Sequence, residues 1–232
     1  MGRTIRLEGL ERSRHLKQLY NITSGRAQGE FKQYDPNEIW CFHNDGPFEN
    51  EKAMERSGFF RKGKRTAGYG IVEALTDRLL GAILLEEDDP SNLTVSIVPP
   101  FVRPSVDGTV EQVESCFLLM DRLFALGYRR IQMSIDSMDV NGRKLAGRIG
   151  FTQEGTLLKH HIIKDSNRDS TVYGMINSDW NEGAREFLFK KTHGDKMMKA
   201  DKANNVKEEE LEVREKYAAE QKEVKEKANE NN

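Results

Sequence analysis

The sequence has few cysteines and no apolar segment long enough to cross a bilayer. Cys41 and Cys116 lie far apart, in different expected elements, and no Cys-x-x-Cys pair or Cys/His cluster accompanies them. A bound metal is therefore not expected, and two free thiols are favoured over a disulfide. The first residues also lack the apolar core of a signal peptide. These absences favour a cytoplasmic protein that has no membrane partner.

Neither sign of charge dominates the chain. It carries 36 Lys and Arg residues against 38 Asp and Glu residues, a formal net charge of −2 at pH 7. This balance gives no general attraction to nucleic acid, so no nucleic-acid partner is expected. Much of the charge lies near the C-terminus, where Lys, Glu, Asn and Ala leave too little apolar surface for a core. We therefore expect a folded domain over residues 1–190 and a charged tail over residues 191–232, disordered or forming a solvated helix.

Apolar periodicity predicts an α/β domain with a mixed sheet. The expected strands cover residues 69–74, 79–85, 93–98, 131–135, 151–158 and 173–176. The expected helices cover residues 7–20, 48–60, 109–126 and 141–149. The first three strands form an antiparallel meander, and the third ends at Pro99-Pro100. The helix over residues 109–126 then requires a parallel strand pair, because it connects strands through a β–α–β crossover.

Short motifs between residues 126 and 180 are the most specific feature of the chain. Gly150 ends a helix and a strand begins at once with Phe151; glycine suits that position because it readily takes positive φ. The motifs in chain order are Leu126-Gly127-Tyr128-Arg129-Arg130, Gly150-Phe151-x-x-Glu154-Gly155, Asn167-Arg168-Asp169, Tyr173-x-Met175 and Asp179-Trp180. Their order and spacing resemble the GNAT superfamily of N-acetyltransferases. Within it, the chain is similar to the branch of the ribosomal-protein N-terminal (alanine/serine) acetyltransferases and their fungal and bacterial relatives.

That resemblance implies a twisted sheet splayed at its centre and flanked by helices. It also implies acetyl-CoA as the acyl-donor cosubstrate, with the pantetheine arm inserted into the splayed sheet. The pyrophosphate would bind at the start of the helix that follows residue 108, where backbone N–H groups and the helix field favour anions. The residues that the resemblance assigns to the donor are Val95, Ile97, Arg103, Gly108, Thr109, Val110, Asp139 and Asn141.

Two donor positions depart from the family pattern. Before the helix the family has Gln/Arg-x-x-Gly-x-Gly/Ala, whereas this chain places Asp107, Val110 and Gln112 at those three places. A shifted register, Ser105-x-x-Gly108-x-Val110, recovers one glycine. At the next helix Asp139 stands where the family often has Asn; it can cap the helix but cannot donate a hydrogen bond. A non-catalytic binding or regulatory module on the same fold therefore remains an alternative.

The resemblance implies direct attack of an amine on the thioester within a ternary complex. The acceptor would be a protein N-terminus or an amine-bearing small molecule, and the protein a monomer or a homodimer. The amine proton needs a route away from the nitrogen, and the oxyanion needs a donor, usually a backbone N–H. For the proton route we select Asp136, Ser134 and His160. The alternatives are a turn cap for Asp136, a small polar filler for Ser134 and a surface role for His160.

Other polar side chains have simpler structural explanations. His160 and His161 are neighbours on a strand, so their rings are expected on opposite faces and cannot chelate one metal. Asp169 is expected to hold a hairpin together, or else to orient the amine. Glu111 and Glu114, three residues apart on a helix, are expected at a solvated edge.

Overall fold

The computed structural model of this protein describes residues 2–27, 29, 31–60 and 65–194. The chain divides into two compact units, Met1–Leu188 and Phe189–Asn232. The expected tail lies in the second unit, and from residue 195 onwards it is outside the described residues. The boundary at residue 190 therefore stays a prediction. Among the described residues, no helix is both long and apolar enough to cross a membrane.

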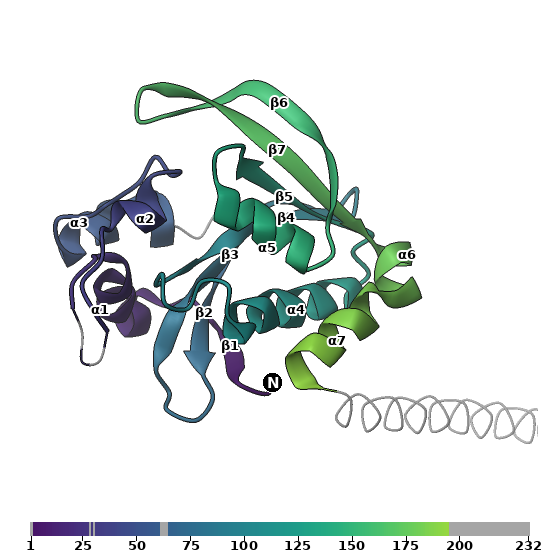
Figure 1. Cartoon of the computed structure of the whole chain (residues 1–232), viewed down its shortest axis with the longest axis horizontal. Coiled ribbons are helices and arrows are strands. Elements are labelled where there is room, and N and C mark those ends of the chain that lie inside the picture. The colour runs from purple at the N-terminus through teal and green to yellow at the C-terminus, as the bar shows by residue number, and fades with distance from the viewer. Residues whose placement is uncertain (1, 28, 30, 61–64, 195–232) are drawn as a thin grey trace, which may run out of the picture. The chain divides into compact units, whose positions relative to one another are not determined.

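The first unit is built on a seven-stranded mixed sheet (Figure 1), whose strand order is β1-β2-β3-β4-β5-β7-β6. The strands are β1 (Ile5–Gly9), β2 (Ala67–Glu73), β3 (Leu79–Asp89), β4 (Thr94–Val102), β5 (Arg130–Asp136), β6 (Thr152–Ile163) and β7 (Ser166–Ile176). Neighbouring strands are antiparallel except for β4 and β5, which are parallel. The expected fold class, a mixed sheet flanked by helices with one β–α–β crossover, is confirmed.

Helices pack on both faces of this sheet. The α-helices of the described residues are α1 (Arg12–Thr23), α2 (Asn37–Trp40), α3 (Glu51–Arg56), α4 (Val110–Ala125), α5 (Val140–Arg148), α6 (Asn177–Asp179) and α7 (Arg185–His193), the last of which crosses the boundary between the two units. The segments α1 to α3 share a core with Val72 and Ala82 of the sheet. Because side chains alternate along a strand, Ile71 and Ile83 point to the opposite face, and both are fully buried. In Figure 1, α4 and α5 lie in front of the sheet.

The N-terminal segment differs from expectation. The first residues form the edge strand β1 instead of the first part of a helix, with Ile5 opposite Glu73 of β2. Glu114 explains this placement, because its carboxylate accepts hydrogen bonds from the backbone N–H groups of Arg3 and Thr4. Glu114 is fully buried, so the expectation that it lies at a solvated edge with Glu111 is wrong.

Strand β4 does not end at Pro99-Pro100 but continues to Val102. Between two paired positions, Leu84 with Val98 and Ala82 with Phe101, β4 contains one residue more than β3. That extra residue is a β-bulge, and the two prolines lie inside it. Proline has no N–H to give to a sheet, so a bulge is one of the few places where it fits.

Candidate active site

The strands β4 and β5 separate at the centre of the sheet. They are in register only over three positions, Thr94–Ser96 against Arg130–Gln132. Beyond these pairs β4 continues beside β3, and β5 continues beside β7 to Asp136. In the part of the chain that the structure describes, the two facing edges therefore have no strand partner beyond the last pair. Their backbone groups are open to an extended ligand.

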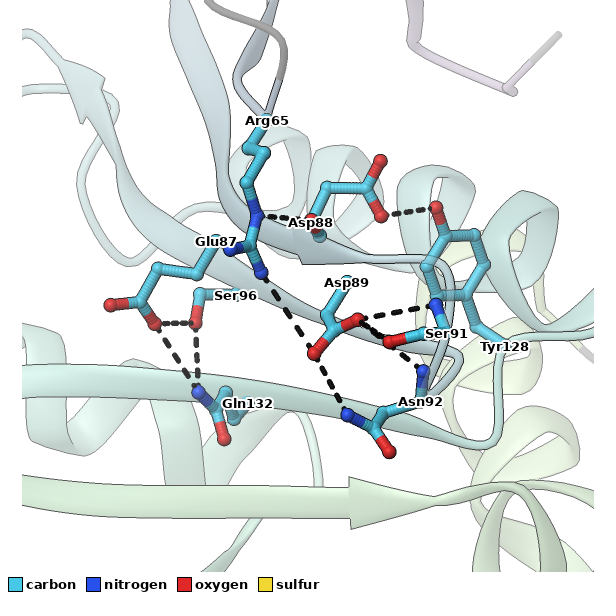
Figure 2. A network of polar contacts seen from close by, with 9 residues as sticks. All are labelled: Arg65, Glu87, Asp88, Asp89, Ser91, Asn92, Ser96, Tyr128 and Gln132. Carbon is cyan, nitrogen blue, oxygen red and sulfur yellow. Dashed lines mark hydrogen bonds and ion pairs between the residues drawn. The ribbon is translucent and has the colours of Figure 1, made fainter.

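A polar network holds the strands together at the point where they separate (Figure 2). Ser96 Oγ donates to Glu87 Oε2 at 2.8 Å, and Gln132 Nε2 donates to Ser96 Oγ at 3.0 Å. In the adjoining turn, Asp89 accepts from Ser91 and Asn92, and these hydrogen bonds lower the pKa of Asp89 to about 2. Ser96 is thus part of the frame of the site and is not a free hydroxyl.

Two adjoining cavities lie at this separation. The larger has a volume of about 830 Å³ and the smaller of about 380 Å³. The residues common to both linings are Phe42, His43, Pro99, Phe101 and Asp139. A molecule in one cavity would therefore meet a molecule in the other at the bulge of β4.

The larger cavity is aromatic and acidic. Its aromatic lining consists of Trp40, Phe42, Phe59, Phe60, Tyr69 and Phe101. Its acidic lining consists of Glu11, Asp45, Glu86, Asp136 and Asp139. Among the residues described, Glu11, Asp45 and Glu86 form no ion pair. Burial, and secondarily the charge of Glu87, raises the pKa of Glu86. Aromatic faces and unpaired carboxylates together favour a cation.

Asp136 and Ser134, both selected from the sequence, line the larger cavity. Asp136 accepts from Arg168 Nε at 2.7 Å and from Arg168 Nη2 at 3.1 Å. It also accepts from the N–H of Met138 at 2.8 Å, so it caps the turn as its alternative interpretation predicted. These contacts give Asp136 a structural role at the end of β5.

The histidine pair lies differently from the expectation. The rings of His160 and His161 are 4.0 Å apart between centroids, so their placement on opposite faces is wrong. Lys159 has a φ of 51°, and the register with β7 shifts between Leu157 and His161. This irregularity breaks the alternation of side chains. His161 lines the larger cavity, whereas Nδ1 of His160 is 3.0 Å from Ser170 Oγ.

Asp169 stabilises the same irregularity. Its Oδ1 accepts a hydrogen bond of 2.7 Å from the N–H of Lys159. The turn of this hairpin follows at Lys164 and Asp165, which both have positive φ. Its tip reaches the helical segment before the meander, because Nζ of Lys164 donates to the carbonyl of Trp40 at 3.0 Å. The structural interpretation of Asp169 is therefore confirmed.

His43 is a site residue that the sequence analysis missed. Burial, together with the positive charge of Lys164, lowers the pKa of His43 to about 4. Its ring packs against Phe101 at 4.5 Å and Trp40 at 6.1 Å between centroids. It is therefore a neutral imidazole at neutral pH, at the junction of the two cavities. No spacing or motif in the sequence indicates this position, which depends on long-range packing.

Only some of the residues that the sequence analysis assigns to the acyl donor line the smaller cavity. Asp139 and Asn141 line the smaller cavity, and Asp139 caps α5 by accepting from the N–H of Gly142 at 2.8 Å. Val95 lies opposite Ile131 in the β4–β5 pair, and Ile97 lies just beyond the last pair. Both side chains are buried in the core, so these two residues present only backbone to a ligand.

Arg103 lies away from both cavities. Its guanidinium stacks over Phe31 at 4.7 Å and over Tyr34 at 5.5 Å. It is 4 % exposed, and its contacts hold the loop after α1. The structure therefore does not bring this side chain to the loop that contains Gly108.

The backbone N–H groups of the loop before α4 donate hydrogen bonds within the loop and to the first turn of α4. The N–H groups of Val106 and Asp107 donate to the carbonyl of Arg103, and that of Thr109 donates to Val106. The N–H of Gly108 donates to Oε1 of Gln112 at 2.8 Å. Nε2 of Gln112 in turn donates to Oδ1 of Asp107 at 2.8 Å. Gly108 has a φ of +74°, and Thr109 precedes α4 as its N-cap residue.

Solved structures share this architecture. A probable acetyltransferase of the GNAT family from Chromobacterium violaceum has a TM-score of 0.70 and 27% sequence identity, covering 78% of this chain and 87% of that one. A GCN5-related N-acetyltransferase from Brucella melitensis has a TM-score of 0.70 and 22% identity, covering 81% and 84%. No family model matches the sequence, and no match to a curated protein is significant.

One similar structure contains ligands. The spermidine N-acetyltransferase from Vibrio cholerae in complex with CoA and spermine has a TM-score of 0.60 and 17% identity, covering 77% of this chain and 98% of that one. Together these similarities show that the chain has the GNAT fold. Its branch within the superfamily is not resolved by them.

Proposed function

We propose that this protein transfers an acetyl group from a CoA thioester, acetyl-CoA in the first instance, to a primary amine. The observation that carries the proposal is the pair of adjoining cavities at the separation of β4 and β5. The smaller cavity takes the thioester end of the donor, and the larger takes the amine. Both reactants then meet beside His43, in a ternary complex that needs no covalent enzyme intermediate.

A cationic amine is the acceptor that the larger cavity favours. Glu11, Asp45 and Glu86, which form no ion pair with another described residue, would attract it, and the surrounding aromatic rings would pack against its carbon chain. The similar structure from Vibrio cholerae, with spermine bound, supports a small amine. A protein N-terminus, the acceptor in the branch that the sequence resembles, is the second acceptor to test.

The proton route is assigned to His43, with Ser134 and Asp136 beside it. An acceptor that binds as an ammonium ion first releases one proton to solvent. Its neutral nitrogen then attacks the thioester carbonyl, the new C–N bond forms and the C–S bond breaks. In this step the nitrogen loses one proton and the thiolate gains one. A neutral imidazole can accept the first and return the second. Asp136, held by Arg168, orients groups in this cavity and does not itself take the proton.

The bulge of β4 restricts where the oxyanion can be stabilised. Pro99 and Pro100 have no N–H groups, so neither can donate to it. The nearest donors on the strand are the backbone N–H groups of Val98 and Phe101, on either side of the prolines. The oxyanion donor is therefore a backbone group, and its position depends on the bulge.

A transfer assay tests this proposal. Purified protein is incubated with acetyl-CoA and a panel of monoamines, polyamines and N-terminal peptides, and acetylated products are identified by mass spectrometry. Acetylation of at least one amine, abolished in His43→Phe but retained in His160→Phe, is the expected result. Binding of donor and amine without transfer to any member of the panel would contradict it.

A second candidate function is a non-catalytic binding or regulatory module. The observation that favours it is the loop before α4, where the N–H of Gly108 already donates to Oε1 of Gln112. Such a module would bind the amine at the larger cavity and would not turn over. Retention of amine binding in His43→Phe, combined with absence of transfer by the unaltered protein, would establish this alternative.

A further inference from the structure

The turn that carries His43 is held at a single carbonyl group. The carbonyl of Trp40 accepts a hydrogen bond of 3.1 Å from the backbone N–H of His43 and another of 3.0 Å from Nζ of Lys164. Trp40 itself is fixed in place, because it is 1 % exposed and its indole N–H donates to the carbonyl of Thr23 at 3.0 Å. Lys164 thus contacts the turn at the point that sets the position of His43.

Lys164 reaches this carbonyl from a distant part of the chain. It lies in the turn of the β6–β7 hairpin, 124 residues after Trp40, and Figure 1 shows this turn above α2 in the view. The hairpin also contributes His161, Ile163 and Arg168 to the lining of the larger cavity. Among the described residues, Lys164 itself lines neither cavity. The hydrogen bond therefore joins two walls of the cavity from outside it.

The charges around His43 also depend on this contact. Burial, and after it the positive charge of Lys164, lowers the pKa of His43 to about 4, whereas the charge of Asp136 acts in the opposite direction. The carboxylate of Asp136 is bound to Arg168. The larger cavity has further titratable groups in its lining, namely Glu11, Asp45, Tyr69, Glu86, Asp139 and His161. While Lys164 contacts the turn, the imidazole of His43 stays buried and neutral.

Resting on the proposed function, we infer that Lys164 is a positioning residue for acetyl transfer, which holds the turn of His43 through the carbonyl of Trp40. A base must lie within hydrogen-bond reach of the nitrogen whose proton it accepts. Lys164 gives the imidazole that fixed place and takes no proton from the substrate. Without Lys164, the hairpin and the turn lose the contact that joins them, and His43 becomes accessible to water and free to change its orientation.

Two substitutions of Lys164 and one of Lys159 test this inference. Lys164→Met removes the charge and the hydrogen-bond donor, whereas Lys164→Arg keeps both. Lys159→Met is the matched control, because it removes a lysine from the same hairpin at nearly the same backbone φ, 51° against 49°. We would measure kcat and KM for acetyl-CoA and an accepted amine at pH 8, where the imidazole is neutral. The pKa of His43 would be followed by NMR titration of its ring.

The expected changes concern kcat and the pKa of His43 together. In Lys164→Met, kcat should fall about fivefold with KM for acetyl-CoA unchanged, because a charge-assisted hydrogen bond that positions the base is lost. The pKa of His43 should rise from about 4 toward its ordinary value of 6.5, because the positive charge and part of the burial are lost. Lys164→Arg should restore most of both properties, and Lys159→Met should change neither.

Three results would contradict the inference. An unchanged kcat in Lys164→Met, or a lower kcat with an unchanged pKa of His43, would overturn it and leave acetyl transfer intact. Equal losses in Lys159→Met would also overturn it, because the effect would then belong to the hairpin in general and not to the contact with Trp40. If the unaltered protein transfers no acetyl group to any amine of the panel, the proposed function fails and the inference fails with it.

Discussion

Arg168 of β7 binds the carboxylate of Asp136, at the end of β5, through two hydrogen bonds of 2.7 and 3.1 Å. The Asp136 side chain is 5% exposed and that of Arg168 21%. The guanidinium also lies over the ring of Phe42 at 5.4 Å. One arginine therefore connects the strand that carries the cavity's buried carboxylate, the β6–β7 hairpin and the loop after α2.

Removal of Arg168 should destabilise the protein. Arg168→Met leaves the carboxylate of Asp136 buried without its cation, which we expect to cost about 3 kcal/mol of unfolding free energy. Urea denaturation measures the change. Asp136→Asn in the same background should recover part of the loss, because the uncompensated charge is gone. If the effects of the two substitutions on the unfolding free energy are additive, Arg168 and Asp136 do not stabilise each other.

Glu114 should contribute more to stability than its helix neighbour Glu111. Glu114→Ala leaves the N–H groups of Arg3 and Thr4 without their buried acceptor, at a cost of about 3 kcal/mol. Glu111→Ala, on the same turn of α4, is the control and should change stability by no more than about 0.5 kcal/mol. Denaturant midpoints compare the two variants. Equal effects would show that the β1 segment is not held by this carboxylate.

His43 should make the protein less stable in acid. The pKa of His43 is about 4 in the folded protein, against an ordinary value of 6.5. Between these values the unfolded chain binds more protons than the folded chain, so stability rises with pH across this window. As the pH falls from above 6.5 to below 4, this difference in pKa lowers the unfolding free energy by about 3 kcal/mol.

Two variants isolate this contribution. In His43→Phe, which keeps an aromatic ring in the same packing, and in His43→Gln, the slope of stability against pH between 4 and 6.5 should be smaller than in the unaltered protein. Denaturation followed at several pH values gives the slopes. Parallel slopes in all three proteins would show that His43 is protonated as readily in the folded state as in the unfolded one.

Glu86 should determine affinity for amines that carry a second positive charge. With Glu86→Gln we expect KM for a diamine to rise about fivefold, with kcat little changed, because a partly exposed charge contributes about 1 kcal/mol. KM for a monoamine should rise less. Glu87→Gln is the matched control on the same strand, since Glu87 binds Ser96 outside the larger cavity. If KM for the diamine rises equally in both variants, Glu86 does not bind the second positive charge of the diamine.

Most of the helices and strands after residue 66, and their order along the chain, could be predicted from the sequence because their signals are local. Strand and helix periodicity, the glycine after α5 and the cap at Asp139 each depend on a few neighbouring residues. Strand β1 could not be recognised in this way. Leu7 and the following Leu10 also fit helical spacing, and what makes β1 a strand is pairing with β2 and the carboxylate of Glu114, both far away in the chain.

The site was only partly predictable for the same reason. Asp136 follows from its position at the end of a strand and Ser134 from its position near the splayed centre of the sheet, and both line the larger cavity. The sequence analysis selects His160 from the histidine pair, whereas His161 lines the larger cavity, and the positive φ of Lys159 interrupts the expected alternation of the two side chains. The closure of the loop by Gln112 and the burial of His43 depend on contacts that no motif encodes.

Initial-velocity kinetics test the central claim most directly, with acetyl-CoA and an accepted amine varied together. Direct attack across the separation of β4 and β5 predicts intersecting lines in the double-reciprocal plot, and an unmodified protein by intact mass when the donor is present alone. Parallel lines, with an acetyl group found on Cys41 in the smaller cavity, would show a covalent intermediate and contradict the claim.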